Sequence, residues 1–175
     1  MRIIAGEWGG RRISAPAGTG VRPTTDRVRE AWMSILAPQI PGSRVLDLFA
    51  GSGALGLETL SRGAAEVVFV ERARGALKAL RANVQELDAG ERAQIRPGDV
   101  FPFLDSVDPL AFDLALADPP YDQGLAARLL ERFQARPFAR ELWVEHRTAE
   151  PLPDLPGLRQ RRYGDTTLSH LEALE

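Results

Sequence analysis

The segment RVLDLFAGSGALG, residues 44–56, decides the fold that we expect. Residues 45–50 form an apolar run with the length of a buried strand, Gly51-Ser52-Gly53 predicts a tight turn, and residues 54–62 predict a helix that Gly63 ends. Glycines in such a turn let the backbone approach a ligand closely. The pattern G-x-G-x-x-G therefore favours a nucleotide-like cofactor, and turn glycines without a ligand are the alternative.

The rest of the chain repeats this alternation of strand and helix. Strands that alternate with helices form a mostly parallel sheet with helices on both faces. The tail departs from the pattern, because Gly164-Asp165 between two β-type runs predicts an antiparallel hairpin. We therefore expect an α/β fold with a seven-stranded, mostly parallel sheet and a carboxyl-terminal β-hairpin. The further strands and helices predicted are 66–71, 73–87, 94–96, 112–117, 125–134, 142–145, 158–163 and 166–171.

The first 42 residues form a separate part of this organisation. Residues 1–25 mix β-type residues with glycines and prolines, which predicts a short hairpin or arm followed by a loop. Thr25 or Asp26 then caps a helix that ends near Pro38. We expect this amino-terminal arm and helix, residues 1–42, to pack on a main domain of residues 43–175.

The composition of the whole chain excludes several classes of function. The 175 residues include no cysteine and only two histidines, so disulfides, zinc–thiolate sites and a thiol nucleophile are impossible and no metal site is expected. No apolar run approaches the roughly 20 residues that span a bilayer, and the amino terminus lacks the apolar core of a signal peptide. We therefore expect a cytoplasmic protein with no membrane partner, and a monomer by default.

Basic residues gather in two places although the net charge is −2. A nucleic acid would have to be bound by such a local patch. Trp8 lies in the first patch and is a candidate for stacking on RNA, whereas a solvated surface is the alternative for each arginine. The first patch contains Arg2, Arg11, Arg12, Arg22, Arg27 and Arg29, and the second contains Arg159, Arg161 and Arg162.

The tetrad Asp118-Pro119-Pro120-Tyr121 follows a predicted buried strand. Two prolines remove two backbone donors and prevent the strand from continuing. The Asp118 carboxylate and the Pro119 carbonyl can accept hydrogen bonds from an amino group, and the Tyr121 ring can stack on a nucleobase. This combination favours chemistry on an exocyclic nitrogen of a base.

Acidic side chains at other strand ends indicate the type of cofactor. Glu71 ends the second strand, where a carboxylate can bind the hydroxyls of a ribose, as in both NAD and S-adenosylmethionine. Asp47 would repel a pyrophosphate but suits an α-amino or sulfonium group. Asp99 is a candidate for accepting from an adenine amino group, with Val100 or Phe101 beside the ring. A helix cap for residues 101–107 is the equally favoured alternative for Asp99.

Taken together, these motifs resemble the class I S-adenosylmethionine-dependent methyltransferases that methylate amino groups. More narrowly, the chain resembles the bacterial 16S rRNA guanine-N2 methyltransferase family, the RsmD type. The resemblance covers essentially the whole chain, in the same order. The segments that carry it are 2–6, 22–30, 47–58, Glu71, 118–121 and 163–165.

The resemblance implies a Rossmann-like fold and a role for each motif. It implies transfer of a methyl group from S-adenosylmethionine to N2 of a guanine in 16S rRNA, on an assembled or assembling small subunit. The arm would lie over the active site, and Arg22 or Thr24 would approach the cofactor carboxylate or an RNA phosphate. The implied catalytic residues are Asp118, Pro119, Pro120 and Tyr121. The implied cofactor residues are Asp47, Phe49, Gly51, Ser52, Gly53, Glu71, Arg72, Asp99 and Val100. The implied RNA residues are Arg2, Arg11, Arg12, Arg22, Thr24 and Arg27.

Three alternatives use the same residues differently. A DNA adenine or cytosine methyltransferase would share the tetrad, and a methyltransferase for protein glutamine would more typically carry Asn at the position of Asp118. A non-catalytic RNA-binding module is the alternative from another class, and the intact tetrad argues against it.

Overall fold

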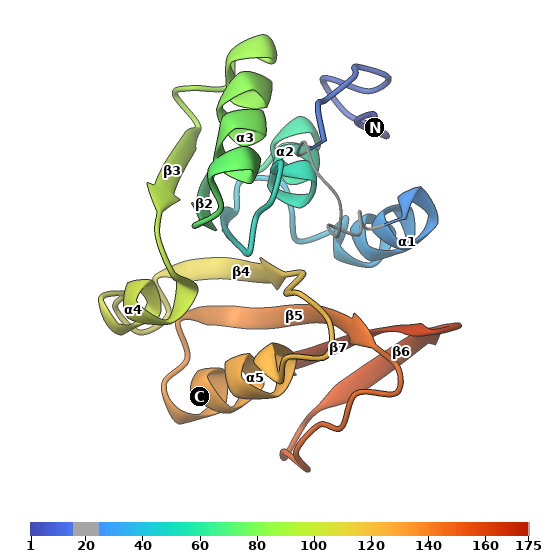
Figure 1. The fold of residues 1–175 in the computed structure, drawn as a ribbon, viewed down its shortest axis with the longest axis vertical. Helices are drawn as coiled ribbons and strands as arrows, with labels where there is room; N and C mark the ends of the chain where they lie inside the picture. The colour runs from blue at the N-terminus through green and yellow to red at the C-terminus, as the bar shows by residue number, and fades with distance from the viewer. Residues whose placement is uncertain (16–24, 175) are drawn as a thin grey trace.

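The computed structural model describes residues 1–15 and 25–174, so the predicted site residues Arg22 and Thr24 lie outside the described residues. Seven strands form one sheet in the order β3-β2-β1-β4-β5-β7-β6, which confirms the predicted α/β fold (Figure 1). The strands are β1 (Arg44–Leu48), β2 (Glu66–Glu71), β3 (Ala93–Pro97), β4 (Phe112–Ala117), β5 (Ala139–Arg147), β6 (Arg159–Tyr163) and β7 (Thr166–Glu172). The helices are α1 (Asp26–Leu36), α2 (Ala54–Ser61), α3 (Arg74–Glu86), α4 (Val100–Asp105) and α5 (Leu125–Ala135).

The pairing of the strands places the ligand-binding edge. Strand β1 pairs in parallel with both β2 and β4, and β4 pairs in parallel with β5. The chain therefore leaves β1 in one direction towards β2 and β3 and later continues from β4 in the other direction. In open α/β sheets, ligands bind at the carboxyl ends of the strands where the strand order reverses. Here this position is the carboxyl ends of the paired strands β1 and β4.

Helices cover both faces of the sheet (Figure 1). Residues of α1, α2 and α3 pack with one face, around Trp32, Leu57, Phe69 and Leu80. Residues of α4 and α5 pack with the other face, together with Leu46 and Leu142 of the central strands. Two buried faces explain why the central strands are continuous apolar runs and do not alternate apolar with polar residues.

The tail forms the predicted hairpin, in which β7 pairs antiparallel with both β6 and β5. Strand β5 is longer than predicted because Ala139 at its amino end pairs with β4, and Glu141, His146 and Arg147 pair with β7. His146, expected after the strand, lies within it, buried, with Nε2 2.6 Å from Ser169 Oγ. None of the helices in the described part of the chain has the length and apolar character needed to cross a bilayer.

The amino-terminal arm, residues 1–15, closes into a loop and not a regular hairpin. A single antiparallel bridge joins Arg2 to Arg12, and Gly10 N donates to the Ile3 carbonyl at 2.8 Å. The loop packs against α2, and its Gly6 has a φ of +86°. A Cβ at Gly6 would lie 2.0 Å from the Ser61 carbonyl oxygen, so only glycine permits this close approach.

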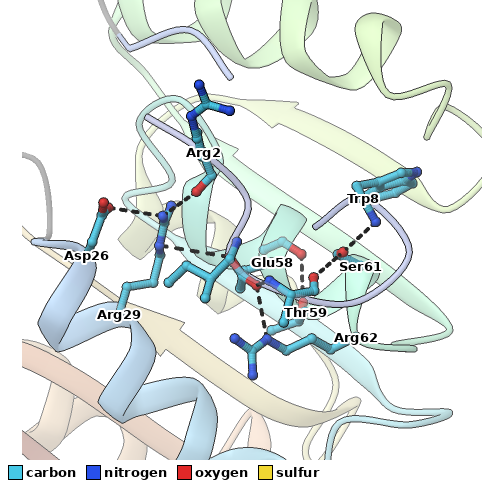
Figure 2. A network of polar contacts seen from close by, with 11 residues as sticks. Arg2, Trp8, Asp26, Arg29, Glu58, Thr59, Ser61 and Arg62 are labelled. Carbon is cyan, nitrogen blue, oxygen red and sulfur yellow. Dashed lines mark hydrogen bonds and ion pairs between the residues drawn. The ribbon is translucent and has the colours of Figure 1, made fainter. Parts of the chain in front are cut away.

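A buried carboxylate fastens the arm to α2 (Figure 2). Glu58 is fully buried, and its oxygens accept from Ile4 N at 2.8 Å, Ala5 N at 3.1 Å and Arg62 Nε at 3.0 Å. Arg29 Nε of α1 lies 3.9 Å from the same carboxylate, and Arg29 also donates to the Arg2 carbonyl. Arg29 was grouped with the basic surface patch, which was wrong, because it is fully buried in this network.

Trp8 also belongs to the interior. It is only 5% exposed, and the guanidinium of Arg92 lies 5.0 Å from its ring centre. The backbone N–H of Trp8 donates to Ser61 Oγ at 2.9 Å, which holds the residue against α2. The expectation that Trp8 is available to stack on RNA was therefore wrong.

Candidate functional site

The glycine loop connects β1 to α2 at the carboxyl edge of the sheet. Strand β1 ends at Leu48, two residues earlier than predicted, because Phe49 adopts a φ of 55° and turns the chain. Gly53 caps α2 with a φ of 87° in the left-handed region, which favours glycine. Ser52 is buried and Gly51 half-buried, so the loop lies packed at the end of the strand.

Asp47 lies beneath this loop and is almost completely buried. Its Oδ2 accepts a hydrogen bond from Gly56 N, in the first turn of α2, at 2.9 Å. Burial raises the pKa of Asp47 well above its usual value, the Gly56 hydrogen bond opposes this, and the charges of Asp118 and Glu71 raise it further. The three carboxylates therefore create a site where a bound positive charge is stabilised.

Glu71 at the end of β2 has more backbone partners than its sequence position suggests. Its Oε1 accepts from Gly51 N at 2.8 Å, and its Oε2 accepts from Arg72 N and Ala73 N, both at 2.8 Å. A carboxylate offers about four acceptor positions. Glu71 thus joins the glycine loop to the start of α3, and about one acceptor position remains for a ligand hydroxyl unless a backbone bond is exchanged. Arg72 is exposed beside it.

The predicted adenine residues lie at the start of α4. Asp99 is at the helix N-cap position, but its side chain makes no capping hydrogen bond. The alternative prediction, that the Asp99 carboxylate caps the helix, is therefore wrong. Val100 is buried behind it. Phe49 and Phe101 pack edge to face with ring centres 6.4 Å apart, and Arg128 of α5 lies 3.7 Å from the Phe101 ring centre. Sequence reasoning missed Arg128, because no pattern in the sequence indicates that α5 packs beside the Phe101 ring.

The tetrad lies at the carboxyl end of β4, next to the glycine loop that follows β1. Asp118 is half-buried, Pro119 is buried and Pro120 is exposed. Because β1 and β4 are paired neighbours, with Leu48 opposite Ala117, the tetrad and the loop leave the sheet side by side. The sequence alone could not place two segments so far apart in the chain on neighbouring strands.

Tyr121 is held by residues that sequence reasoning missed. Its hydroxyl lies 3.3 Å from Glu145 Oε1 and 3.1 Å from Thr166 Oγ1. Glu145 is fully buried in β5, and Thr166 begins β7. The guanidinium of Arg147 lies 4.8 Å from the Tyr121 ring centre and pairs with Asp122 at 3.2 Å. The signal in the sequence that could have indicated these partners is the acidic residue Glu145 inside the otherwise apolar centre of β5.

The predicted RNA arginines of residues 1–15 lie on the β3-β2-β1 half of the sheet. Arg2 Nη1 donates to the Gly10 carbonyl at 2.9 Å, and Arg11 Nη2 donates to the Glu86 carbonyl at the end of α3 at 2.8 Å. Arg2, Arg11, Arg12 and Arg27 are all exposed. Residues 1–15 thus pack on α2 and the carboxyl-terminal end of α3. The position of the arm over the active site, which the resemblance implies, stays a prediction, because residues 16–24 of that arm lie outside the described part of the chain.

Asn83 of α3 connects the arm to the glycine loop, and sequence reasoning did not assign it. Its side-chain amide accepts from Ser14 N at 2.7 Å and donates to the Ser14 carbonyl at 2.9 Å. It also donates to the Ser52 carbonyl at 3.0 Å. A single buried amide therefore fixes the position of the arm relative to the glycine loop.

Known proteins share this sequence and this architecture. The family model described as Conserved hypothetical protein 95 matches residues 1–172. Ribosomal RNA small subunit methyltransferase D of Escherichia coli K12 is 37% identical over 159 residues, which cover 89% of this chain and 79% of that protein. A hypothetical protein of Thermus thermophilus has a solved structure with a TM-score of 0.84, 31% identity and 99% coverage of both chains. An RNA methyltransferase from Salinibacter ruber, solved with S-adenosyl-L-homocysteine, shares the fold at 16% identity and a TM-score of 0.67, over 88% of this chain and 95% of its own.

Proposed function

Because this chain belongs to the Conserved hypothetical protein 95 family, which includes the small-subunit rRNA methyltransferases D, we propose that it transfers a methyl group from S-adenosylmethionine to N2 of a guanine in 16S rRNA. One observation carries the chemical part of this proposal. The Asp118-Pro119-Pro120-Tyr121 tetrad and the glycine loop follow neighbouring parallel strands, β4 and β1, at the point where the strand order reverses. A methyl donor and an amino acceptor would meet there.

The charges of the site fit S-adenosylmethionine better than a dinucleotide. The cofactor carries positive sulfonium and ammonium groups, whereas a pyrophosphate is negative. Burial, and then the charges of Asp118 and Glu71, raise the pKa of Asp47, and a bound cation relieves this repulsion. Asp47 and the glycine loop would hold the methionine part, Glu71 the ribose, and Asp99 with Val100 the adenine.

The residues of the tetrad would then position the acceptor. A guanine amino group is a poor nucleophile because its lone pair is delocalised into the ring. Two acceptors, the Asp118 carboxylate and the Pro119 carbonyl, would hold its hydrogens and favour a lone pair that points at the donated methyl group. Asp118 would accept a proton during or after transfer. The acceleration would come from positioning and electrostatics, without a covalent enzyme intermediate.

Tyr121 would stack on the target base after that base leaves its neighbours. The hydrogen bonds to Glu145 and Thr166 fix the orientation of the ring. Arg147 already covers one face of this ring, so a base must use the other face or displace the guanidinium. The net charge of −2 favours an assembled particle as substrate, where a preformed surface supplements the electrostatic attraction to RNA.

Transfer of a labelled methyl group tests this function. The protein is incubated with labelled S-adenosylmethionine and, separately, with unmethylated small ribosomal subunits, naked 16S rRNA, DNA or protein, and the labelled product is digested and identified. We expect N2-methylguanosine from rRNA. Label only in DNA or protein would establish one of the alternative acceptors and refute the rRNA proposal.

Two substitutions separate the roles of the carboxylates. Asp118→Ala should abolish turnover and leave S-adenosylmethionine affinity nearly unchanged, whereas Glu71→Ala should weaken cofactor binding. Asp105→Ala, which removes an exposed carboxylate that pairs with Arg132 at 3.4 Å, is the matched control and should change neither quantity. Equal losses of cofactor affinity in the Asp118 and Glu71 variants would show that the roles are divided incorrectly.

A further inference from the structure

The exposed edge strand β6 carries the second basic patch of the sequence. Strand β6 ends the sheet beyond β7, and its residues 159–162 are exposed. Arg159 lies opposite His170, Arg161 opposite Leu168 and Tyr163 opposite Thr166. Residues two apart on a strand share a face. Arg159, Arg161 and Tyr163 therefore form one row along the face that α1 covers near the centre of the sheet, and we name it the β6 row.

The β6 row leads to the tetrad. Its last member, Tyr163, is paired with Thr166, whose Oγ1 lies 3.1 Å from the Tyr121 hydroxyl. The adjacent turn is held to β5 by Thr148, whose N donates to the Asp165 carbonyl at 2.6 Å and whose Oγ1 donates to the Gly164 carbonyl at 3.0 Å. The hairpin turn is thus fixed beside the carboxyl edge. Successive members of the row are about 7 Å apart.

The other end of the row opens into a hollow of about 560 Å³. Arg159 and Arg161 line it, and the stacked rings of Trp143 and His170, with centres 3.9 Å apart, also lie there. Burial lowers the pKa of His170, so this side chain is neutral near pH 7 and adds no charge. Glu141 and Glu172 line the hollow towards the amino edge of the sheet. Among the residues that line the hollow, the two arginines therefore lie nearer the tetrad than the two glutamates do.

We propose that the β6 row binds the sugar–phosphate backbone of the RNA next to the target nucleotide. This rests on the proposed function, in which RNA is the acceptor. The tetrad occupies the β4-β5-β7-β6 half of the sheet, so the RNA strand that enters it approaches over this half. The described arm arginines lie on the other half, and Arg2 and Arg11 already donate to backbone carbonyls. Arg159 and Arg161 are exposed cations that lie beside the acceptor path.

Salt-dependent binding tests the β6 row. The variant Arg159→Gln/Arg161→Gln removes two charges and keeps side-chain length. The control Arg81→Gln/Arg140→Gln removes two exposed charges, from α3 and from the amino end of β5. Each lost phosphate contact lowers the slope of log K against log [salt] by about 0.7 to 0.9. We therefore expect the slope to fall by about 1.4 to 1.8 and the Kd at about 0.15 M salt to rise roughly 15- to 30-fold, whereas the control changes the Kd less than about threefold.

The measurement uses small ribosomal subunits and naked 16S rRNA, with S-adenosylmethionine affinity and thermal unfolding of each variant as folding checks. Arg159→Lys/Arg161→Lys should restore the slope because it restores both charges. An unchanged slope in the Gln variant, or equal weakening in the control, would overturn the β6 row proposal. Failure of the proposed function is distinguishable, because the wild-type protein would then transfer no methyl group to rRNA whatever the variants bind.

Discussion

Replacing Glu58 with Gln should remove the principal anchor of the amino-terminal arm (Figure 2). One oxygen of the buried carboxylate faces Ile4 N and Arg29 Nε, and the other faces Ala5 N and Arg62 Nε. A glutamine has the same shape but only one acceptor oxygen. Whichever way its amide turns, the NH2 group meets two donors, and the buried charge of Arg29 loses its buried partner.

The cost can be estimated from these contacts. Breaking one partner of a buried ion pair typically costs about 3–5 kcal/mol. Asp26, the other acidic partner of Arg29, is 75% exposed and so compensates little. We therefore expect the unfolding free energy to fall by about 3–5 kcal/mol, which for a chain of this size lowers the Tm by roughly 6–20 °C.

Urea and thermal denaturation of Glu58→Gln measure this change. Glu66→Gln is the matched control, because Glu66 pairs with Arg44 at the surface with 47% of its side chain exposed. The control should lose less than about 1 kcal/mol. Limited proteolysis should also cut residues 1–15 faster in Glu58→Gln. A loss no larger than that of Glu66→Gln would refute the view that the buried carboxylate holds the arm.

Three further substitutions test the site. Asp47→Asn keeps an acceptor for Gly56 N and removes a buried charge. Because the pKa of Asp47 is raised in the folded protein, the stability of the wild type should fall relative to that of the variant as pH rises above 3.8, which denaturation across the acid and neutral range measures. Calorimetry should also show that the variant binds S-adenosylmethionine more weakly. Gly56→Ala places a Cβ 2.4 Å from Phe69 Cε1, so unfolding experiments should show a loss of about 1–3 kcal/mol. Tyr121→Phe removes the hydroxyl contacts to Glu145 and Thr166, and single-turnover kinetics should show about tenfold slower transfer at unchanged cofactor affinity.

The results of these three substitutions can each contradict the structural argument. Equal pH profiles for Asp47→Asn and the wild type would show that ionisation of the buried Asp47 carboxyl does not affect stability. An unchanged free energy of unfolding in Gly56→Ala would mean that the Phe69 ring moves away from the new Cβ without a loss of stability. An unchanged rate of methyl transfer in Tyr121→Phe would show that the hydroxyl contacts that orient the ring do not affect the reaction.

Local patterns in the sequence predicted the parts of the fold that depend on neighbouring residues. The strand–turn–helix unit at residues 44–61, the hairpin at 159–172 and the tetrad after β4 all lie where they were predicted. Errors of two or three residues occurred at strand ends such as β1 and β5, where backbone geometry and pairing with β7 determine the boundary. Local periodicity is determined by side chains that are close in sequence, so it can be recognised without the tertiary structure.

The amino-acid sequence by itself determined an α/β architecture, a glycine loop followed by Glu71, and the position of the Asp118-Pro119-Pro120-Tyr121 tetrad at a strand end. Tertiary structure decided what the charged and aromatic residues do. Arg29 and Trp8 became buried, Glu71 accepted three backbone hydrogen bonds, and Tyr121 found partners 24 and 45 residues away. The physical reason is that burial and hydrogen bonding depend on which distant segments pack together, and this depends on the order and direction of the strands in the sheet.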